Sequence, residues 1–339
     1  MLNKVMSEKF EGLSALVNNT PLLEISLKYK NEERKIYAKA EYFNFSGSIK
    51  DRIAYHILKH SYKAELIKEG DIIAEASSGN TGISLSAIGA FLGNPVHIFM
   101  PDWMTKERIQ LMECFNANIK LISKKEGGFI GSIKKAEEMG AKKGVFLPRQ
   151  FSNSLNIDAH YKTTGQEILQ QLHKIGVKPD GLVAGVGTGG TVMGIKKAFK
   201  EIYPHCKAFP LDPLNSPTMA SGGKKTGPHR IAGIGDEFIP EIIKLNELDD
   251  IIMVDDGDSI NMSRKLAKDL GIGVGISSGA NFLGVLKAQD ILKNKDALIV
   301  TVFADDNKKY LSTELTKEIE IRTDFLSKDV ELLDFRAFR

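Results

Sequence analysis

Short apolar segments that run through glycine- or serine-rich turns into helical sequences are the feature that most limits the fold of this chain. The apolar segments are DIIAEA, VHIFM, LVAGV and ALIVTVFA, and the turns SSGNTG and GTGGT lead from two of them into helical sequences. Strands that alternate with helices are typical of a mostly parallel sheet. The sequence therefore predicts an α/β fold, with mostly parallel twisted sheets flanked by helices.

The chain of 339 residues is long enough for two domains. The regular alternation of predicted strands and helices stops in the polar, turn-rich stretch 147–168 and resumes after it, so we place a domain boundary there. We expect a smaller, mobile domain over residues 45–152 and a larger domain made of 1–44 together with 153–339. A long loop rich in glycine and proline, 211–240, has the length of a functional or mobile segment.

Composition disfavours several functional classes. With 42% hydrophobic and 26% charged residues and a net charge of +3 spread along the chain, no nucleic-acid partner is expected. No apolar run reaches the ~18 residues of a membrane span, and no apolar signal segment opens the sequence, so we expect a cytoplasmic protein without a membrane partner. Cys114 and Cys206 form no metal-ligand spacing, so we expect a reducing compartment and no metal.

The turn GVGTGGT, residues 185–191, follows a predicted strand and opens a predicted helix. Its glycines let backbone N–H groups close on an anion, and the helix N-terminus adds a partial positive charge. The run matches neither the Walker sequence nor the dinucleotide fingerprint. It predicts a phosphate-binding turn, and a purely structural tight turn is the alternative.

Two further turns carry serines. SSGNTG, residues 77–82, places four short hydrogen-bonding side chains at the head of an apolar helix, although N-capping needs only one. We interpret it as a carboxylate-binding turn, with ordinary capping as the alternative. GISSGAN, residues 275–281, has a similar composition but indicates little by itself.

Lys50 lies in the first turn of a predicted amphipathic helix, where the helix dipole disfavours a cation. An ordinary surface lysine is one interpretation. A cofactor that carries a phosphate, an aldehyde and a ring nitrogen would instead use the three turns and the lysine together. Pyridoxal 5′-phosphate is such a cofactor, and a lysine amine forms its Schiff base. Burial would also lower the pKa of the Lys50 ammonium, as a nucleophilic amine requires.

The order of motifs along the chain resembles a known family. The motifs are NNTPLLEI, SGSIKDR, SSGNTG, NIDAHYKTTGQEI, GVGTGGT, DPLNSP, GPHRIAGIG, GISSGA and KKYLST. The chain resembles the fold type II (β-family) pyridoxal-phosphate enzymes, within the cysteine synthase and cystathionine β-synthase branch. The resemblance implies a homodimer whose subunits have two α/β domains.

The resemblance also implies residue roles. Lys50 would hold the internal aldimine and then move the proton at the substrate Cα. Asn80 would hydrogen-bond the cofactor O3′, and Ser277, rather than Ser278, would face the pyridine nitrogen. His160 would be structural. The phosphate would be bound by Gly187, Thr188, Gly189, Gly190 and Thr191. The substrate carboxylate would be bound by Ser77, Ser78, Thr81 and Gln150.

The expected reaction is β-replacement on a small amino acid. A serine opposite the pyridine nitrogen makes a weaker electron sink than a carboxylate would, which favours rapid loss of a β-leaving group. The donor would be O-acetylserine, O-phosphoserine or L-cysteine, with an aminoacrylate intermediate shielded by closure of the smaller domain. With L-cysteine as donor, hydrogen sulfide would be released, and lanthionine or cystathionine formation would be related outcomes.

Three positions depart from typical cysteine synthases. Asp236 and Glu237 stand where a small residue and a glycine are usual, and Phe45 stands where proline is common. One interpretation makes Asp236 or Glu237 a general base for the incoming nucleophile. The alternative is that Asp236 caps a helix beginning at Glu237. Two alternatives belong to other classes. The glycine spacing disfavours a nucleotide-dependent oxidoreductase, and the intact lysine disfavours a catalytically silent binding protein.

Overall fold

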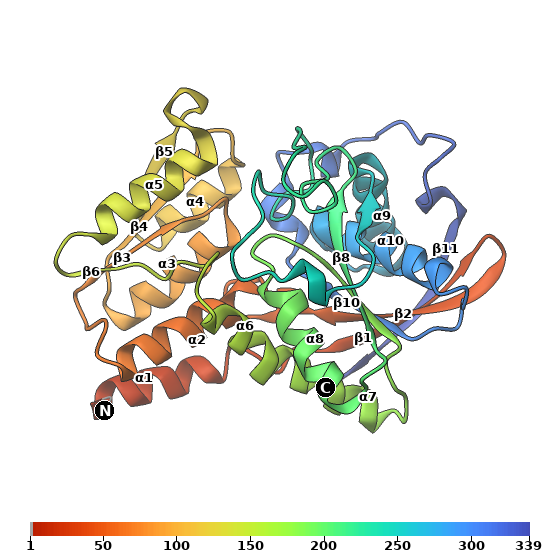
Figure 1. Cartoon of the computed structure of the whole chain (residues 1–339), viewed down its shortest axis with the longest axis horizontal. Helices are drawn as coiled ribbons and strands as arrows, with labels where there is room; N and C mark the ends of the chain where they lie inside the picture. The colour runs from red at the N-terminus through yellow and green to blue at the C-terminus, as the bar shows by residue number, and fades with distance from the viewer. Residues whose placement is uncertain (1–2) are drawn as a thin grey trace.

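The computed structural model describes residues 3–339, which form two sheets flanked by helices (Figure 1). The helices are α1 (Lys4–Ser14), α2 (Lys50–Lys63), α3 (Asn80–Leu92), α4 (Lys106–Cys114), α5 (Gly128–Gly140), α6 (Leu155–Ala159), α7 (Gln166–Lys174), α8 (Gly190–Ile202), α9 (Asp256–Leu270) and α10 (Ile276–Ile291). The strands are β1 (Leu22–Tyr29), β2 (Glu32–Ala40), β3 (Ile72–Ala76), β4 (Val96–Pro101), β5 (Asn118–Ile122), β6 (Val145–Phe146), β7 (Gly181–Gly185), β8 (Lys207–Pro213), β9 (Ile252–Val254), β10 (Ile299–Phe303) and β11 (Val330–Phe338).

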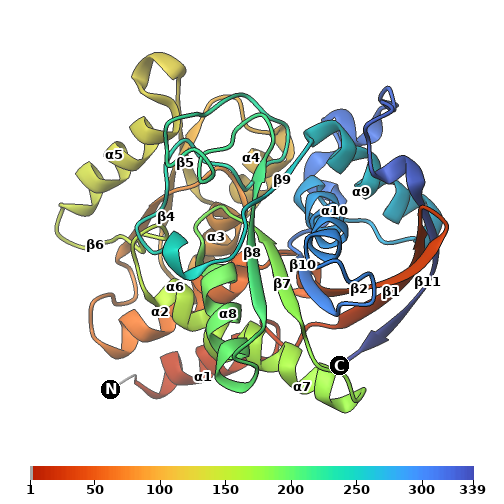
Figure 2. The ribbon, with the colours of Figure 1, turned by 45° about the vertical axis from the view of Figure 1, so that its right-hand side comes forward.

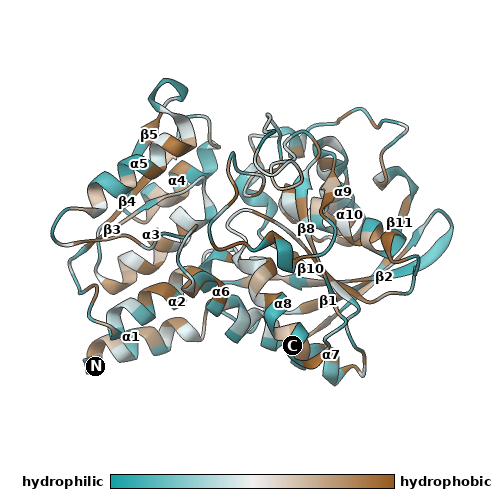
Figure 3. Ribbon diagram, in the orientation of Figure 1, coloured by the Kyte–Doolittle hydropathy of each residue, from teal (hydrophilic) through white to brown (hydrophobic). Residues whose placement is uncertain are grey.

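The larger sheet has seven strands in the order β11-β1-β2-β10-β7-β8-β9. β1 pairs antiparallel with β11 and β2, and the strands from β2 to β9 are parallel. Along β7, Leu182 and Ala184 pack in the cluster that includes α8, whereas Val183 packs with α10 on the other face. Helices on both faces explain why LVAGV is apolar throughout rather than alternating. Figure 3 shows β10 as hydrophobic and the tip of the β1–β2 hairpin as hydrophilic.

The smaller sheet has four parallel strands in the order β5-β4-β3-β6. Ile73 of β3 packs with residues of α1 to α4 on one face, and Ala74 packs with α5 on the other. Phe10 of α1 contacts Tyr55 and Tyr62 of α2, with ring centroids 5.9 and 5.6 Å apart. The predicted α/β class with two mostly parallel sheets is confirmed, and the domain limits at 45–152 stay a prediction.

The stretch 147–168 differs from the sequence-based expectation. Its second half is helical, because α6 continues through a π-helical segment, His160–Gly165, into α7. Gly194 of α8 explains this, since a Cβ there would lie 2.5 Å from Ile157 O and 2.6 Å from His160 Cβ. Close helix packing thus stabilises a sequence whose Asn, Thr and Gly residues favour helix only weakly.

A buried ion network fixes the start of α2 against the larger sheet. The Arg52 guanidinium lies 2.6 Å from Glu41 and 2.7 Å from Glu167, and Lys39 of β2 lies 2.9 Å from Glu167. Arg52 and Glu41 are almost fully buried. Buried charges are held only when paired and hydrogen-bonded, so this network positions the helix that begins at Lys50.

The turns that follow β3 and β7 lie beside the carboxyl ends of β10 and β8, since Asn80 hydrogen-bonds Asp305 and Val186 N donates to Leu211 O. Parallel strands present their carboxyl ends at one edge, where ligands of α/β proteins bind. The long segment after β8 lies between the smaller and the larger sheet in the view of Figure 1, and in the turned view of Figure 2 it passes across α4 and β5. A functional site is therefore expected at this edge.

Candidate active site

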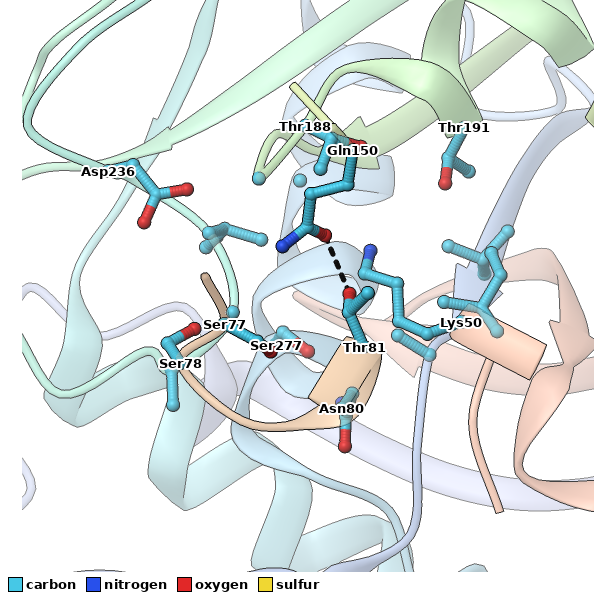
Figure 4. A pocket seen from close by; sticks show the side chains of 18 of the residues that line it. Lys50, Ser77, Ser78, Asn80, Thr81, Gln150, Thr188, Thr191, Asp236 and Ser277 are labelled. Atoms are coloured by element: carbon cyan, nitrogen blue, oxygen red, sulfur yellow. Dashed lines mark hydrogen bonds between the residues drawn. The ribbon is translucent and has the colours of Figure 1, made fainter. Parts of the chain in front are cut away.

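A cavity lies at this edge, and residues from all three predicted turns line it (Figure 4). Every predicted site residue lines the cavity except Gly189 and Gly190, which form the start of α8 beside it. The predicted residues in the cavity wall are Lys50, Ser77, Ser78, Asn80, Thr81, Gln150, Gly187, Thr188, Thr191, Asp236 and Ser277.

Lys50 is the first residue of α2 and projects into the cavity. Burial lowers the pKa of its ammonium, and the carboxylates of Asp236 and Asp305 act in the opposite direction without overcoming burial. A lysine held this way supplies the neutral amine more readily than a surface lysine does.

The turn before α8 can pack as it does only because its glycines lack side chains. A Cβ on Gly187 would lie 2.4 Å from Gly233 O, and one on Gly190 would lie 1.9 Å from Asn156 Oδ1. Gly189 has a φ of 87°, which L side chains rarely adopt. The backbone N–H groups at the start of α8, together with Thr188 and Thr191, therefore form a cup that suits a phosphate.

Substituting Gly190 by alanine is expected to weaken binding of a phosphate-bearing cofactor by about 10- to 100-fold, because the clash with Asn156 must displace the turn. Gly12→Ala in α1 is the matched control, since, apart from the adjacent residues and the backbone of α1 itself, no heavy atom among the described residues lies within 4 Å of that Cβ position. Fluorescence titration of the apoenzyme with pyridoxal phosphate measures the effect. Equal affinities for the two variants would contradict the assignment of this turn.

The turn before α3 combines capping with further hydroxyls that line the cavity. Ser77 Oγ accepts hydrogen bonds from the backbone N–H groups of Gly79 (3.1 Å) and Gly82 (2.9 Å), so this serine does cap the turn. Thr81 Oγ1 donates to Gln150 Oε1 at 2.6 Å, which brings Gln150 to the head of α3 (Figure 4). Ser78 also faces the cavity. Hydroxyls, an amide and a helix N-terminus together suit a carboxylate.

Glu75 of β3 accepts hydrogen bonds from backbone N–H groups next to the turn before α3. Its Oε2 accepts from Gln150 N at 3.1 Å and its Oε1 from Ala76 N at 2.9 Å. Burial raises the pKa of the Glu75 carboxyl to about 7, against the lowering effect of these hydrogen bonds.

When folding raises the pKa of a carboxyl, the folded state binds its proton more tightly than the unfolded state does. The free energy of unfolding is then highest below the unfolded pKa and falls as pH rises through the folded pKa. Between pH 4.5 and about 7, Glu75 should therefore cost the folded protein up to about 3 kcal/mol. Urea unfolding of the parent and of Glu75→Gln across this range measures it. The stability difference between the two should shift steadily in favour of the glutamine variant as pH rises, and a constant difference would refute this prediction.

Asn80 and Ser277 lie on the remaining walls. Asn80 Nδ2 donates to Asp305 Oδ2 at 2.8 Å, whereas its buried Oδ1 has no partner among residues 3–339. Ser277, in the first turn of α10, lines the cavity. Ser278 instead points to the backbone, where its Oγ accepts from Ala304 N at 3.1 Å. Of the two serines, Ser277 is the one placed to meet a bound group.

Asp236 faces the same cavity as Lys50, and Figure 4 shows them on opposite sides of Gln150 and Thr81. No helix begins at Glu237, so the interpretation of Asp236 as a helix cap is wrong. Glu237 is exposed and lines only the neighbouring cavity. Burial raises the pKa of the Asp236 carboxyl to about 6, although the Lys50 ammonium opposes this and Glu237 adds to it.

Sequence reasoning missed four polar residues of the site region. Arg108, Asn281 and Asp305 lie at or beside the cavity, and Asn156 connects its walls by donating to Gln150 O (2.8 Å) and Thr188 Oγ1 (2.9 Å). Of these, Asp305 alone had a usable signal, because it follows the carboxyl end of a parallel strand. His160 is buried, bonds Thr164 (2.9 Å) and does not line the cavity.

These residues fit pyridoxal 5′-phosphate. The cup at the start of α8 suits its phosphate, the amine of Lys50 suits its aldehyde, and Asn80 and Ser277 offer groups for its ring substituents. The unpaired Asn80 Oδ1 and the steric demands at Gly187 and Gly190 point to a site shaped for a ligand.

Comparison with known proteins also indicates a pyridoxal-phosphate enzyme. Residues 13–305 match the family described as pyridoxal-phosphate dependent enzymes, and the chain belongs to this family, within its cysteine synthase branch. It is 38% identical over 301 residues to a probable cysteine synthase of Bacillus subtilis, covering 88% of this chain and 96% of that protein.

Two solved structures are more similar. A hydrogen sulfide-producing enzyme from Fusobacterium nucleatum shares 54% identity, with a TM-score of 0.93 and coverage of 96% of this chain and 97% of that one. An aspartate-to-asparagine mutant of a hydrogen sulfide-producing enzyme, crystallised with an α-aminoacrylate intermediate, shares 54% identity with a TM-score of 0.94 and the same coverage.

Proposed function

We propose that this enzyme catalyses β-replacement with L-cysteine as the donor amino acid, and releases hydrogen sulfide. Pyridoxal phosphate held at Lys50 would supply the electron sink for loss of the Cα proton and of the β-substituent. The 54% identity to hydrogen sulfide-producing enzymes supports cysteine as donor.

The observation that carries this proposal is Asp236 in the same cavity as Lys50. A carboxylate with a pKa of about 6 is ionised at neutral pH yet basic enough to accept a proton from water or a thiol. Lys50 would move the proton at the substrate Cα, and Asp236 would deprotonate the incoming nucleophile. A carboxylate here also repels anionic sulfide as nucleophile, which favours release of sulfide over its capture.

The other residues hold the reactants. Thr81, Gln150, Ser77 and Ser78 would bind the donor carboxylate at the head of α3, which turns the Cα proton toward Lys50. Asn80 and Ser277 would orient the cofactor ring. The phosphate would lie against Gly187, Thr188, Gly189, Gly190 and Thr191.

Synthesis of cysteine from O-acetylserine or O-phosphoserine is the second candidate. The 38% identity to a probable cysteine synthase over 96% of its length favours it. The two candidates share the binding residues and differ in the role of Asp236.

A second, larger cavity adjoins the first and shares Arg108 and Asp236 with it. Arg108 is 2% exposed, its guanidinium stacks on the Tyr310 ring at 4.9 Å, and no ion pair joins it to a carboxylate within the described part of the chain. A buried cation without a carboxylate partner suits the carboxylate of an amino-acid nucleophile that enters here.

Arg108→Met is therefore expected to raise KM for an amino-acid thiol acceptor by about 10- to 100-fold, because a charged hydrogen bond is lost. With 2-mercaptoethanol, which carries no carboxylate, KM should be unchanged. Steady-state kinetics with both acceptors measures the contrast. An equal effect on both acceptors would refute a carboxylate-binding role for Arg108.

The choice of donor is tested by comparing kcat/KM for sulfide release from L-cysteine with kcat/KM for cysteine formation from O-acetylserine and sulfide. We expect L-cysteine to be the better donor. A higher kcat/KM for O-acetylserine would overturn the proposal and favour cysteine synthesis.

A homodimer in the cytoplasm also belongs to this proposal. The dimer rests on the family resemblance, and the two free cysteines suit a reducing compartment. In residues 3–339, no helix is long and apolar enough to cross a membrane. Light scattering coupled to size exclusion measures the subunit number, and a monomeric mass would contradict the dimer.

A further inference from the structure

Two histidines lie on the helix that begins at Lys50. His56 and His60 are four residues apart in α2, so their side chains share one face, and their ring centroids are 4.3 Å apart. Asp158 of α6 lies against them, with its Oδ2 2.9 Å from His56 Nε2. One ligand atom from each of the three residues lies within 4.8 Å of the other two.

We propose that His56, His60 and Asp158 form a binding site for a divalent transition-metal ion of the zinc class. Two imidazole nitrogens and one carboxylate oxygen are ligands that Zn²⁺, Co²⁺ and Ni²⁺ accept, whereas Mg²⁺ and Ca²⁺ prefer oxygen ligands. Metal–ligand bonds of about 2.0–2.2 Å in a tetrahedron place ligand atoms about 3.3 Å apart, which small side-chain movements reach from the observed spacing. Water would fill the fourth position.

The burial of the three residues suits a metal that enters from solvent. His56 is 9% exposed, and His60 and Asp158 are half-buried, so the site is open on one side. Lys162 Nζ lies 2.8 Å from the same Asp158 oxygen and competes with a cation for it. Its side chain is 53% exposed, which lets it swing into solvent when a metal ion binds.

A metal ion here would join α2 to α6. The two helices already meet through an apolar contact in which Ile53 and Ile57 of α2 pack against Ala159 of α6. A coordinate bond beside this contact would join the C-terminal half of α2 to α6, which lies in the segment between Gln150 and α8. We therefore expect metal binding to raise the unfolding temperature of the holoenzyme.

The test is a Co²⁺ titration of the holoenzyme in a Cys114→Ser background, which removes the exposed thiol. The readouts are the visible d–d absorption of Co²⁺ and calorimetry. One equivalent should bind, and His60→Ala and Asp158→Asn should each weaken binding by more than about tenfold. Lys162→Ala should strengthen it. His173→Ala, which removes an exposed histidine on α7, is the matched control and should bind as the parent does.

Two results would overturn the site. The first is that His60→Ala and Asp158→Asn bind Co²⁺ with the same affinity as the His173→Ala control. The second is an absence of d–d absorption at saturating Co²⁺, which would mean that His56, His60 and Asp158 form hydrogen bonds and ion pairs but coordinate no metal. The cofactor absorption band of each variant confirms that it is folded. Because the readouts report metal coordination directly, they do not depend on the proposed reaction.

Discussion

Asp236→Asn should lower the steady-state turnover of L-cysteine by about 10²- to 10⁴-fold while leaving the cofactor bound. Asparagine keeps the shape of the side chain but cannot accept a proton from the nucleophile. Because Asp236 acts on the incoming nucleophile and Lys50 acts at Cα, release of the first sulfide should survive. A rapid-mixing assay should show a burst of one sulfide per site, followed by slow turnover.

The matched control for this variant is Glu237→Gln, which removes the exposed neighbouring carboxylate. It should retain the turnover of the parent. Undiminished turnover of Asp236→Asn with every donor and nucleophile would contradict the role of Asp236 as a general base.

The pH profile gives an independent check on Asp236. A carboxylate acts as a base when deprotonated, so activity should be full above the Asp236 pKa and be lost as pH falls through about 6. Asp236→Asn should lose this acidic limb of the profile. An identical acidic limb in the variant would assign the titration to another group.

Lys50→Ala should lower turnover by at least about 10³-fold, because the variant lacks both the amine that attaches the cofactor and the group that moves the Cα proton. The cavity left by the lysine side chain should admit a small amine such as methylamine, which should restore part of the activity. The control is Lys63→Ala at the exposed end of the same helix, which should behave as the parent. Activity in Lys50→Ala without added amine would remove Lys50 from the reaction.

The strands, helices and turns could be predicted largely from local sequence patterns. DIIAEA and SSGNTG are adjacent in sequence, so the strand and turn they predicted match β3 and the start of α3 closely. The expectation that the three turns and Lys50 serve one cofactor came from the chemistry of pyridoxal phosphate and from the family resemblance, and residues of all three turns line one cavity with Lys50.

Contacts between distant residues could not be predicted. Asn80 and Asp305 are 225 positions apart, so no local pattern reveals that they share a hydrogen bond. The helical stretch after Leu155 depends on packing against Gly194, and the spacing of His56 and His60 gives no hint of Asp158. The cap interpretation of Asp236 failed because a loop, rather than a helix, follows it.

The most direct measurement of the central claim is the visible absorption spectrum of the purified enzyme during titration with L-cysteine, with sulfide assayed in the same sample. We predict a yellow cofactor band that shifts as L-cysteine is added, accompanied by sulfide release. A protein that stays colourless after addition of pyridoxal phosphate, or a band that L-cysteine leaves unchanged with no sulfide formed, would contradict the account.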